Sequence, residues 1–194
     1  MRSVSFIIPV FNKSSYLKTV INSLKKQKGD FEREYIFIDD GSTDNSLHII
    51  KEETRNLKKC RIFSQKNKGS ANATNRGIKS AKMKYIKFLD ADDVILSDST
   101  DILLEILESN PSYNLAYGLQ RKVVSIKDVD LSEKINVENL SFIKKPTKLA
   151  MRNSMFNPSQ FLVRTDLCKK INGCDERVKF SQEYSLTLKL SMLG

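Results

Sequence analysis

Four short apolar runs alternate with segments of helical periodicity in the first half of the chain. The runs cover residues 4–10, 35–38, 60–63 and 84–89, and each is short enough to be a buried strand. The spacing of apolar residues between them predicts helices over about residues 14–28, 43–55 and 70–81, with Ser14 or Ser15 and Ser42 or Thr43 as N-caps. This alternation predicts an α/β fold, with a mostly parallel sheet flanked by helices.

The pattern is less regular after residue 93. Apolar spacing predicts a helix from Ser97 or Ser99 to about residue 109, strands at 115–118, 122–126 and 160–163, and a helix from Asp166. Residues 127–146 are polar and weakly periodic, which predicts a long loop, and residues 182–193 predict a last amphipathic helix.

Polar residues follow each of the first four predicted strands. Asn12 follows the first strand, Asp39 and Asp40 the second, and Asn67 and Gly69 the third. Asp90-Ala91-Asp92-Asp93 follows the fourth. The carboxyl ends of parallel strands meet at one edge of the sheet, where such folds bind ligands, so we expect one site built from these residues.

The acidic stretch after the fourth strand predicts a cation site. Asp90, Asp92 and Asp93 would repel one another, and a divalent cation with a preference for oxygen ligands, Mg²⁺ or Mn²⁺, relieves that repulsion. The alternative is a solvated acidic turn that caps the next helix. Asp39 or Asp40 can accept hydrogen bonds from a nucleobase or ribose, or can cap the following helix, and Gly41 permits a tight turn between them and that helix.

Composition excludes several classes of protein. The 194 residues fit one domain, and no apolar run approaches the roughly 18 residues of a membrane span. The first residues predict a strand and not a signal peptide. Three unpatterned cysteines and one histidine argue against a zinc site, a disulfide framework and Ser–His or cysteine-nucleophile catalysis. We expect reduced thiols and a cytoplasmic location.

The chain is strongly basic. It carries 33 Lys and Arg against 23 Asp and Glu, a net charge of +10. This charge is explained either by solvated helix faces or by attraction to an anionic substrate or to the inner face of the plasma membrane. No motif indicates a nucleic-acid partner.

Four motifs in order resemble family 2 glycosyltransferases of the GT-A fold. They are Ser5-Phe6-Ile7-Ile8-Pro9-Val10-Phe11-Asn12, Asp39-Asp40-Gly41-Ser42-Thr43-Asp44, Asn67-Lys68-Gly69 with Ala73, Asn75 and Gly77, and Asp90-Ala91-Asp92-Asp93. The resemblance spans essentially the whole chain. It implies one GT-A catalytic domain over residues 1–194, with a nucleotide-binding half at 1–93 and an acceptor half at 94–194.

The resemblance also implies an activity and a set of site residues. A sugar would pass with inversion from a nucleotide-sugar, expected to be a UDP-sugar, to a glycan or lipid-linked acceptor, assisted by Mn²⁺ or Mg²⁺. Asp92 would hold the metal, and Glu183 would be the catalytic base, unless it is an exposed glutamate in the first turn of a helix. The donor would be bound by Pro9, Phe11, Asn12, Asp39, Asp40, Asn67, Gly69, Asn75, Asp90 and Ala91.

Three departures from the family pattern favour a second interpretation. Thr74 replaces the usual arginine of the third motif, for which Arg76 or Lys79 could substitute. Gln182-Glu183 replaces the usual Glu-Asp pair, and the chain ends at Gly194, which we interpret as C-terminal truncation. The alternative is therefore a protein that binds the donor but is catalytically impaired. A phosphoacceptor module would need acids after the first strand, and a nucleotidyltransferase a glycine-rich loop there, and both are absent.

Overall fold

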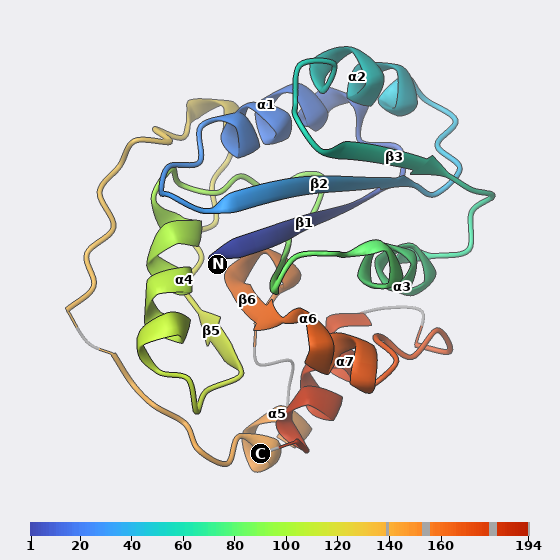
Figure 1. The fold of residues 1–194 in the computed structure, drawn as a ribbon. Helices are drawn as coiled ribbons and strands as arrows, with labels where there is room; N and C mark the ends of the chain where they lie inside the picture. Colours follow the sequence, from blue (N-terminus) through green and yellow to red (C-terminus); the bar gives the residue numbers. More distant parts are fainter. Residues whose placement is uncertain (139, 153–155, 179–181, 194) are drawn as a thin grey trace.

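Six strands form one sheet in the order β3-β2-β1-β4-β6-β5 (Figure 1). The computed structural model describes residues 1–194 apart from 139, 153–155, 179–181 and 194. The strands are β1 (Ser3–Val10), β2 (Glu32–Asp39), β3 (Cys60–Ser64), β4 (Tyr85–Phe88), β5 (Leu115–Tyr117) and β6 (Phe161–Arg164). The helices are α1 (Ser14–Lys25), α2 (Ser46–Glu53), α3 (Ser70–Ser80), α4 (Ser99–Ser109), α5 (Thr147–Arg152), α6 (Thr165–Lys170) and α7 (Gln182–Ser191), with 3₁₀ turns η1 (Ile126–Asp128) and η2 (Pro158–Gln160).

Strands β1 to β4 are parallel, as predicted, and lie at the four apolar runs. β1 is the centre of this half and pairs with β2 on one side and β4 on the other. The strand order therefore reverses between β1 and β4, which opens a crevice at their carboxyl ends. β6 runs antiparallel to β4, and β5 antiparallel to β6.

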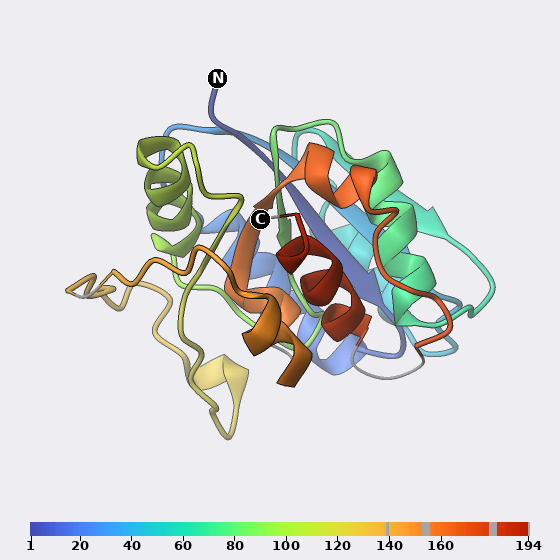
Figure 2. The ribbon, with the colours of Figure 1, turned by 90° about the horizontal axis from the view of Figure 1, so that it is seen from below.

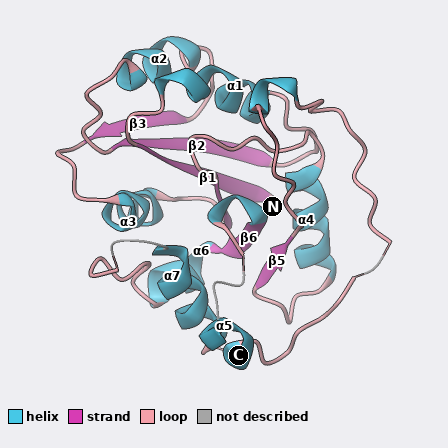
Figure 3. Ribbon diagram, turned by 180° about the vertical axis from the view of Figure 1, so that it is seen from behind, coloured by secondary structure: helices cyan, strands magenta, loops and turns pink. Residues whose placement is uncertain are grey.

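Helices cover both faces of the sheet. One core packs side chains of α1, α2 and α4 against alternate strand residues such as Phe6, Phe37 and Tyr85. The other packs α3, α6 and α7 against residues such as Ile7 and Phe88. Figures 2 and 3 show the sheet between these two layers. The predicted fold class is therefore confirmed.

Several details of the second half were predicted wrongly. Residues 122–126 form no strand, because Val123 and Val124 are 41% and 108% exposed and have no strand partner. η2 and α5 were not predicted, since both are short and α5 buries only Ala150.

The predicted helix caps were also wrong. α1 starts after Lys13 and α2 after Asn45, and neither residue caps its helix through a side-chain hydrogen bond. Asp44 caps the start of both helices instead, because its carboxylate accepts the backbone N–H of Ser14 at 3.0 Å and of Ser46 at 2.9 Å. None of the helices in the described part of the chain is both long enough and apolar enough to cross a membrane.

Candidate active site

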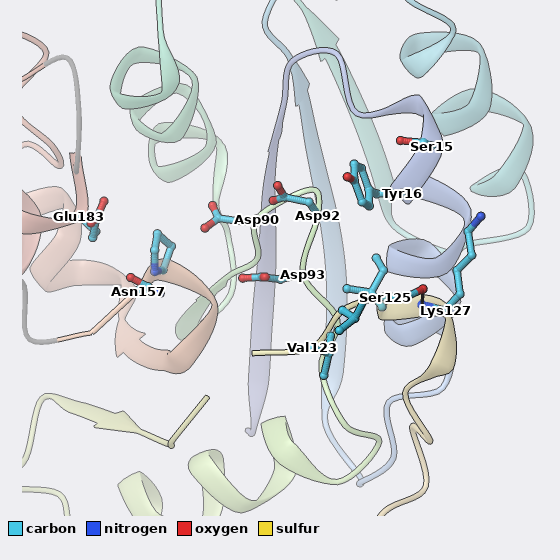
Figure 4. A pocket seen from close by; sticks show the side chains of 13 residues that line it. Ser15, Tyr16, Asp90, Asp92, Asp93, Val123, Ser125, Lys127, Asn157 and Glu183 are labelled. Atoms are coloured by element: carbon cyan, nitrogen blue, oxygen red, sulfur yellow. Dashed lines mark hydrogen bonds between the residues drawn. The ribbon is translucent and has the colours of Figure 1, made fainter. Parts of the chain in front are cut away.

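Four carboxylates line one open cavity of about 730 Å³ at the carboxyl end of β4. Asp90, Asp92 and Asp93 come from the turn after the strand, and Glu183 from the first turn of α7. Figure 4 shows the three aspartates between Glu183 on one side and Tyr16 of α1 on the other. The structure thus brings together the predicted metal-binding and catalytic residues, although they are far apart in the sequence.

The remaining walls of the cavity were missed by the sequence analysis. They are formed by Ser15 and Tyr16 of α1, by residues 123–127, by Pro158 of η2 and by Asn157 just before it. None of the four motifs quoted above includes these residues, and a wrongly predicted strand included four of them. For residues 123–127, Asn157 and Pro158 the only available signal was their position in the half of the chain expected to bind the acceptor, whereas Ser15 and Tyr16 lie in the half expected to bind the nucleotide.

Asp90 is the most strongly perturbed acid of the cavity. Its burial, followed by the negative charges of Asp93, Asp92 and Glu183, raises the pKa of Asp90 to about 7, whereas Lys13 acts in the opposite direction. A site that holds this much negative charge favours a cation.

Asp92 already contacts a cationic group. The Lys13 ammonium lies 2.5 Å from a carboxylate oxygen of Asp92, and both side chains are partly exposed. Among the described residues, no three His, Cys, Asp or Glu side chains are grouped so that they could hold a metal by themselves. One or two carboxylates together with phosphate oxygens of a ligand are a usual site for Mg²⁺, so Asp92 and Asp90 fit a metal that is shared with a substrate.

A buried lysine lies beneath the acidic turn. Lys87, in β4, is 1% exposed, and its ammonium group donates a hydrogen bond to the carbonyl oxygen of Ser159. Burial lowers the pKa of Lys87 to about 7, and the charges of Asp93 and Asp90 partly oppose this shift. A lysine within an apolar strand was the signal that could have identified it.

Asp40 is buried and holds the loop after β3. Its carboxylate accepts hydrogen bonds from the Gln65 amide at 2.8 Å and from the backbone N–H of Lys68 and Gly69 at 2.9 and 2.8 Å. Gly41 has φ 74°, and a Cβ there would lie 2.7 Å from the backbone nitrogen of Asn67, so only glycine fits. The loops that carry the second and third motifs are therefore packed against each other, and their proximity agrees with the prediction.

Asp39 and Asn12 also bind neighbouring loops. Asp39, 2% exposed, accepts hydrogen bonds from the Ser64 hydroxyl at 3.1 Å and the Ser42 N–H at 3.3 Å. Asn12 has φ 52°, and its side-chain oxygen accepts the Thr43 N–H at 2.8 Å.

The other residues predicted to bind the donor lie at or just beyond the carboxyl ends of β1, β3 and β4. Phe11 and Asn67 are exposed, whereas Ala91 is buried at the base of the acidic turn. Pro9 lines a small recess beside Asp90 and Glu183.

The side chain of Asn75 is hydrogen-bonded to the segment that precedes α7. Its amide accepts the Cys174 N–H at 2.7 Å and donates to the Cys174 carbonyl and to Glu176, each at 3.0 Å. The next residue, Asp175, donates its N–H to Ser185 of α7 at 2.9 Å. This α3–α7 latch (Asn75, Cys174, Asp175, Glu176 and Ser185) therefore fixes the helix that carries Glu183, and a donor-binding role for Asn75 stays a prediction.

Thr74 lines the small recess beside Asp90 and Glu183. The two expected substitutes for the missing arginine lie elsewhere. Arg76 donates at 3.0 Å to the Ser64 carbonyl and the Gln65 side chain, and Lys79 is exposed on α3. Neither residue lines the cavity or the recess.

A family model and several curated proteins match this chain. The model described as glycosyl transferase family 2 matches residues 5–171. A poly-beta-1,6-N-acetyl-D-glucosamine synthase of Staphylococcus epidermidis is 34% identical over 121 residues, which are 62% of this chain and 29% of that protein. A chondroitin synthase of Pasteurella multocida is 30% identical over 192 residues, 98% of this chain and 19% of that protein. The chain thus spans less than a third of the length of these relatives.

Solved structures share the fold. S. aureus TarS residues 1–349, in complex with UDP-GlcNAc, superposes with a TM-score of 0.76 at 21% identity, covering 99% of this chain and 54% of that one. A mannosyltransferase from Pyrobaculum calidifontis, in complex with GDP-Man and Mn²⁺, gives a TM-score of 0.74 at 15% identity, covering 98% and 52%.

Proposed function

The chain belongs to glycosyl transferase family 2, and we propose that it is the donor-binding and catalytic domain of an inverting, metal-assisted transferase. The donor is a UDP-sugar, and the acceptor is a hydroxyl group of a glycan or a lipid-linked glycan. The observation that carries this proposal is the cavity in which Asp90, Asp92 and Asp93 lie opposite Glu183. Relatives named as glycan synthases and a neighbour bound to UDP-GlcNAc support the choice of substrates.

The first 93 residues bind the donor in this proposal. The uracil and ribose lie at the carboxyl ends of β1 and β2, next to Phe11 and Asp39, and the diphosphate lies at Asp92. When Mn²⁺ or Mg²⁺ is bound at Asp92 and Asp90, it neutralises the negative charge that develops on the departing UDP. Lys13, which pairs with Asp92, contacts the diphosphate as well in this proposal.

Residues 94–194 supply the acceptor side and the base. The acceptor hydroxyl oxygen attacks the anomeric carbon on the face opposite the diphosphate, and Glu183 takes the hydroxyl proton. The bond from the anomeric carbon to the diphosphate oxygen breaks with its electron pair, UDP leaves, and the configuration of the sugar is inverted. Glu183 lines the same cavity as Asp92, which meets the requirement that base and donor face one acceptor.

Calorimetric titration of UDP, GDP, CDP and TDP, with Mn²⁺ and with a chelator, tests the donor half. We expect UDP to bind only with metal, Asp92→Ala to abolish this binding, and Asp166→Ala, which changes an exposed acid in the first turn of α6, to leave it intact. If none of the four nucleotides binds in the presence of metal, the proposal is wrong for this chain.

Loss of the base tests the catalytic half. Glu183→Gln should keep metal-dependent UDP binding and reduce release of UDP from the UDP-sugar by about 10²- to 10⁴-fold, because only proton transfer is removed. Thr74 favours the alternative of a donor-binding but impaired protein, since no described arginine replaces the missing one in the recess. In that case the wild-type chain would bind UDP, but it would release UDP from the UDP-sugar no faster than the Glu183→Gln variant does.

The net charge of +10 supports a location at the cytoplasmic face of the membrane, where anionic lipid would retain the chain close to lipid-linked acceptors.

A further inference from the structure

Lys87 is a buried cation in the strand that leads into the acidic turn. In the sheet it stands between Phe6 of β1 and Leu162 of β6, and its side chain is among the largest that are fully buried. Burial of an ammonium group costs several kcal/mol unless it is hydrogen-bonded and paired. An apolar residue would fill this position at lower cost, so the fold alone does not explain a lysine here.

The ammonium group of Lys87 binds the turn that forms one wall of the cavity. It donates a hydrogen bond to the carbonyl oxygen of Ser159, in η2. The hydroxyl of the same residue accepts the backbone N–H of Asp90 at 3.0 Å. Asn157 and Pro158, immediately before Ser159, line the cavity beside Glu183. Ser159 therefore connects Lys87 to the backbone of Asp90 and to the cavity wall formed by Asn157 and Pro158.

The other end of this turn is held independently. Gln160 donates its side-chain N–H to the Gly118 carbonyl at 2.9 Å, and its own carbonyl accepts the Gly118 N–H at 3.0 Å. Lys87 and the Asp90 N–H thus tie the turn to β4 and the residues after it, whereas Gly118 ties it to the end of β5.

The charge of Lys87 also acts on the acids above it. Asp93 and Asp90 are close enough for their negative charges to stabilise the ammonium group, and this attraction is mutual. Thr74 stands where the family motif has an arginine, and Lys87 is a cationic group near Asp90 that lies on the opposite face of the sheet from Thr74.

We propose that Lys87 is a positioning residue of the acidic cavity, which ties η2 to β4 and so fixes the backbone of Asp90 opposite Glu183. The inference rests on the proposed function for its consequence, which is the binding of the metal and the nucleotide diphosphate. The positioning itself can be measured in the ligand-free protein.

Lys87→Met and the matched control Lys84→Met test the proposal. Lys84 lies just before β4, is exposed, and pairs with Glu108 at 2.7 Å, so its loss removes a lysine without affecting η2. In ligand-free protein, we expect Lys87→Met to speed hydrogen exchange of the Asp90 amide at least tenfold and Lys84→Met to leave it unchanged. An unchanged Asp90 exchange rate in Lys87→Met would overturn the positioning role, even if no nucleotide binds to the wild type.

Affinity and stability then separate positioning from a merely structural role. With Mn²⁺ present, we expect Lys87→Met to weaken UDP binding at least tenfold, while its thermal midpoint is equal to or higher than that of the wild type because a buried charge is gone. Lys87→Arg, which keeps a cationic donor, should recover most of the affinity. A loss of affinity that accompanies a lower thermal midpoint, or no loss of affinity, would contradict the proposal. Absence of UDP binding by the wild type would instead contradict the proposed function.

Discussion

At the end of β4, the buried Lys87 and the partly buried Asp90, two ionisable groups of opposite charge, lie within a few residues of one another. Burial raises the pKa of Asp90 to about 7 and lowers that of Lys87 to about 7, so each is shifted toward its neutral form. Isolated burial of either charge would be unfavourable, and their proximity makes both tolerable. The cost of this arrangement should be visible in how stability depends on pH.

The stability of the metal-free protein should rise with pH above 7 because of Lys87. Its pKa is lowered to about 7 in the folded state, whereas in the unfolded chain it keeps the ordinary value of 10.5. Between these values the unfolded chain binds the extra proton, so the free energy of unfolding rises by up to about 1.4 kcal/mol per pH unit.

Urea unfolding at pH 7 and pH 8 measures this contribution. The increase should be larger in the wild type than in Lys87→Met, and the difference between the two proteins removes the effect of all other titrating groups. Equal increases in the two proteins would show that Lys87 does not titrate in this range.

Asp40 should be required for stability as well as for any contact with the donor. Its two oxygens accept three hydrogen bonds from the loop after β3, and Asp40→Asn places an N–H₂ against one or more of those donors. We expect the free energy of unfolding to fall by about 2–3 kcal/mol, whereas Asp166→Asn, at an exposed position, should cost less than about 1 kcal/mol. A drop in UDP affinity with no loss of stability would instead identify Asp40 as a direct ligand only.

At the scale of elements, the α3–α7 latch joins α3, in the part of the chain proposed to bind the donor, to the helix that carries Glu183. Asn75→Ala removes all three hydrogen bonds of the Asn75 amide to Cys174 and Glu176. We expect faster hydrogen exchange in α7 and a loss of about 2 kcal/mol of stability, with UDP affinity within about twofold of the wild type.

Asn22→Ala, on the exposed side of α1, is the control and should change none of these quantities. The opposite result for Asn75→Ala, a tenfold weaker affinity for UDP with α7 unaffected, would support the donor-binding role predicted from the sequence.

The elements also explain which parts of the fold the sequence could predict. β1, β2 and β4 are covered by helices on both faces, so their buried parts appear as short apolar runs, whereas β3 is an edge strand of intermediate burial. Their strand ends carry the four motifs, but of the acids in these motifs only Asp90, Asp92 and Asp93 line the cavity, whereas Asp39 and Asp40 hydrogen-bond to neighbouring loops. η2 and α5 bury almost nothing, and residues 122–126 include three apolar side chains without joining a sheet, so their sequence carries no reliable pattern. The contacts of Asp44, Asn75 and Lys87 join residues distant in the chain, which local patterns do not contain.

For the whole molecule, the net charge of +10 predicts association with anionic membranes. Residues 134–148 interleave exposed lysines (Lys134, Lys144, Lys145 and Lys148) with apolar side chains such as Phe142 and Val137, which are 49% and 46% exposed. Cations and apolar groups on one segment are the combination that binds an anionic lipid surface, at about 1 kcal/mol for each lysine near the surface.

Sedimentation with vesicles tests this association. The chain should bind vesicles containing phosphatidylglycerol and not pure phosphatidylcholine, and binding should weaken from about 0.1 M to about 1 M salt, as the Debye length falls from about 10 Å to about 3 Å. Replacing Lys134, Lys144, Lys145 and Lys148 by Gln should abolish binding. The same replacement at four exposed lysines of the α1–α2 side, Lys18, Lys26, Lys51 and Lys58, removes equal charge and should weaken binding only slightly. Equal losses in the two quadruple variants would mean that net charge alone, and not residues 134–148, determines the association.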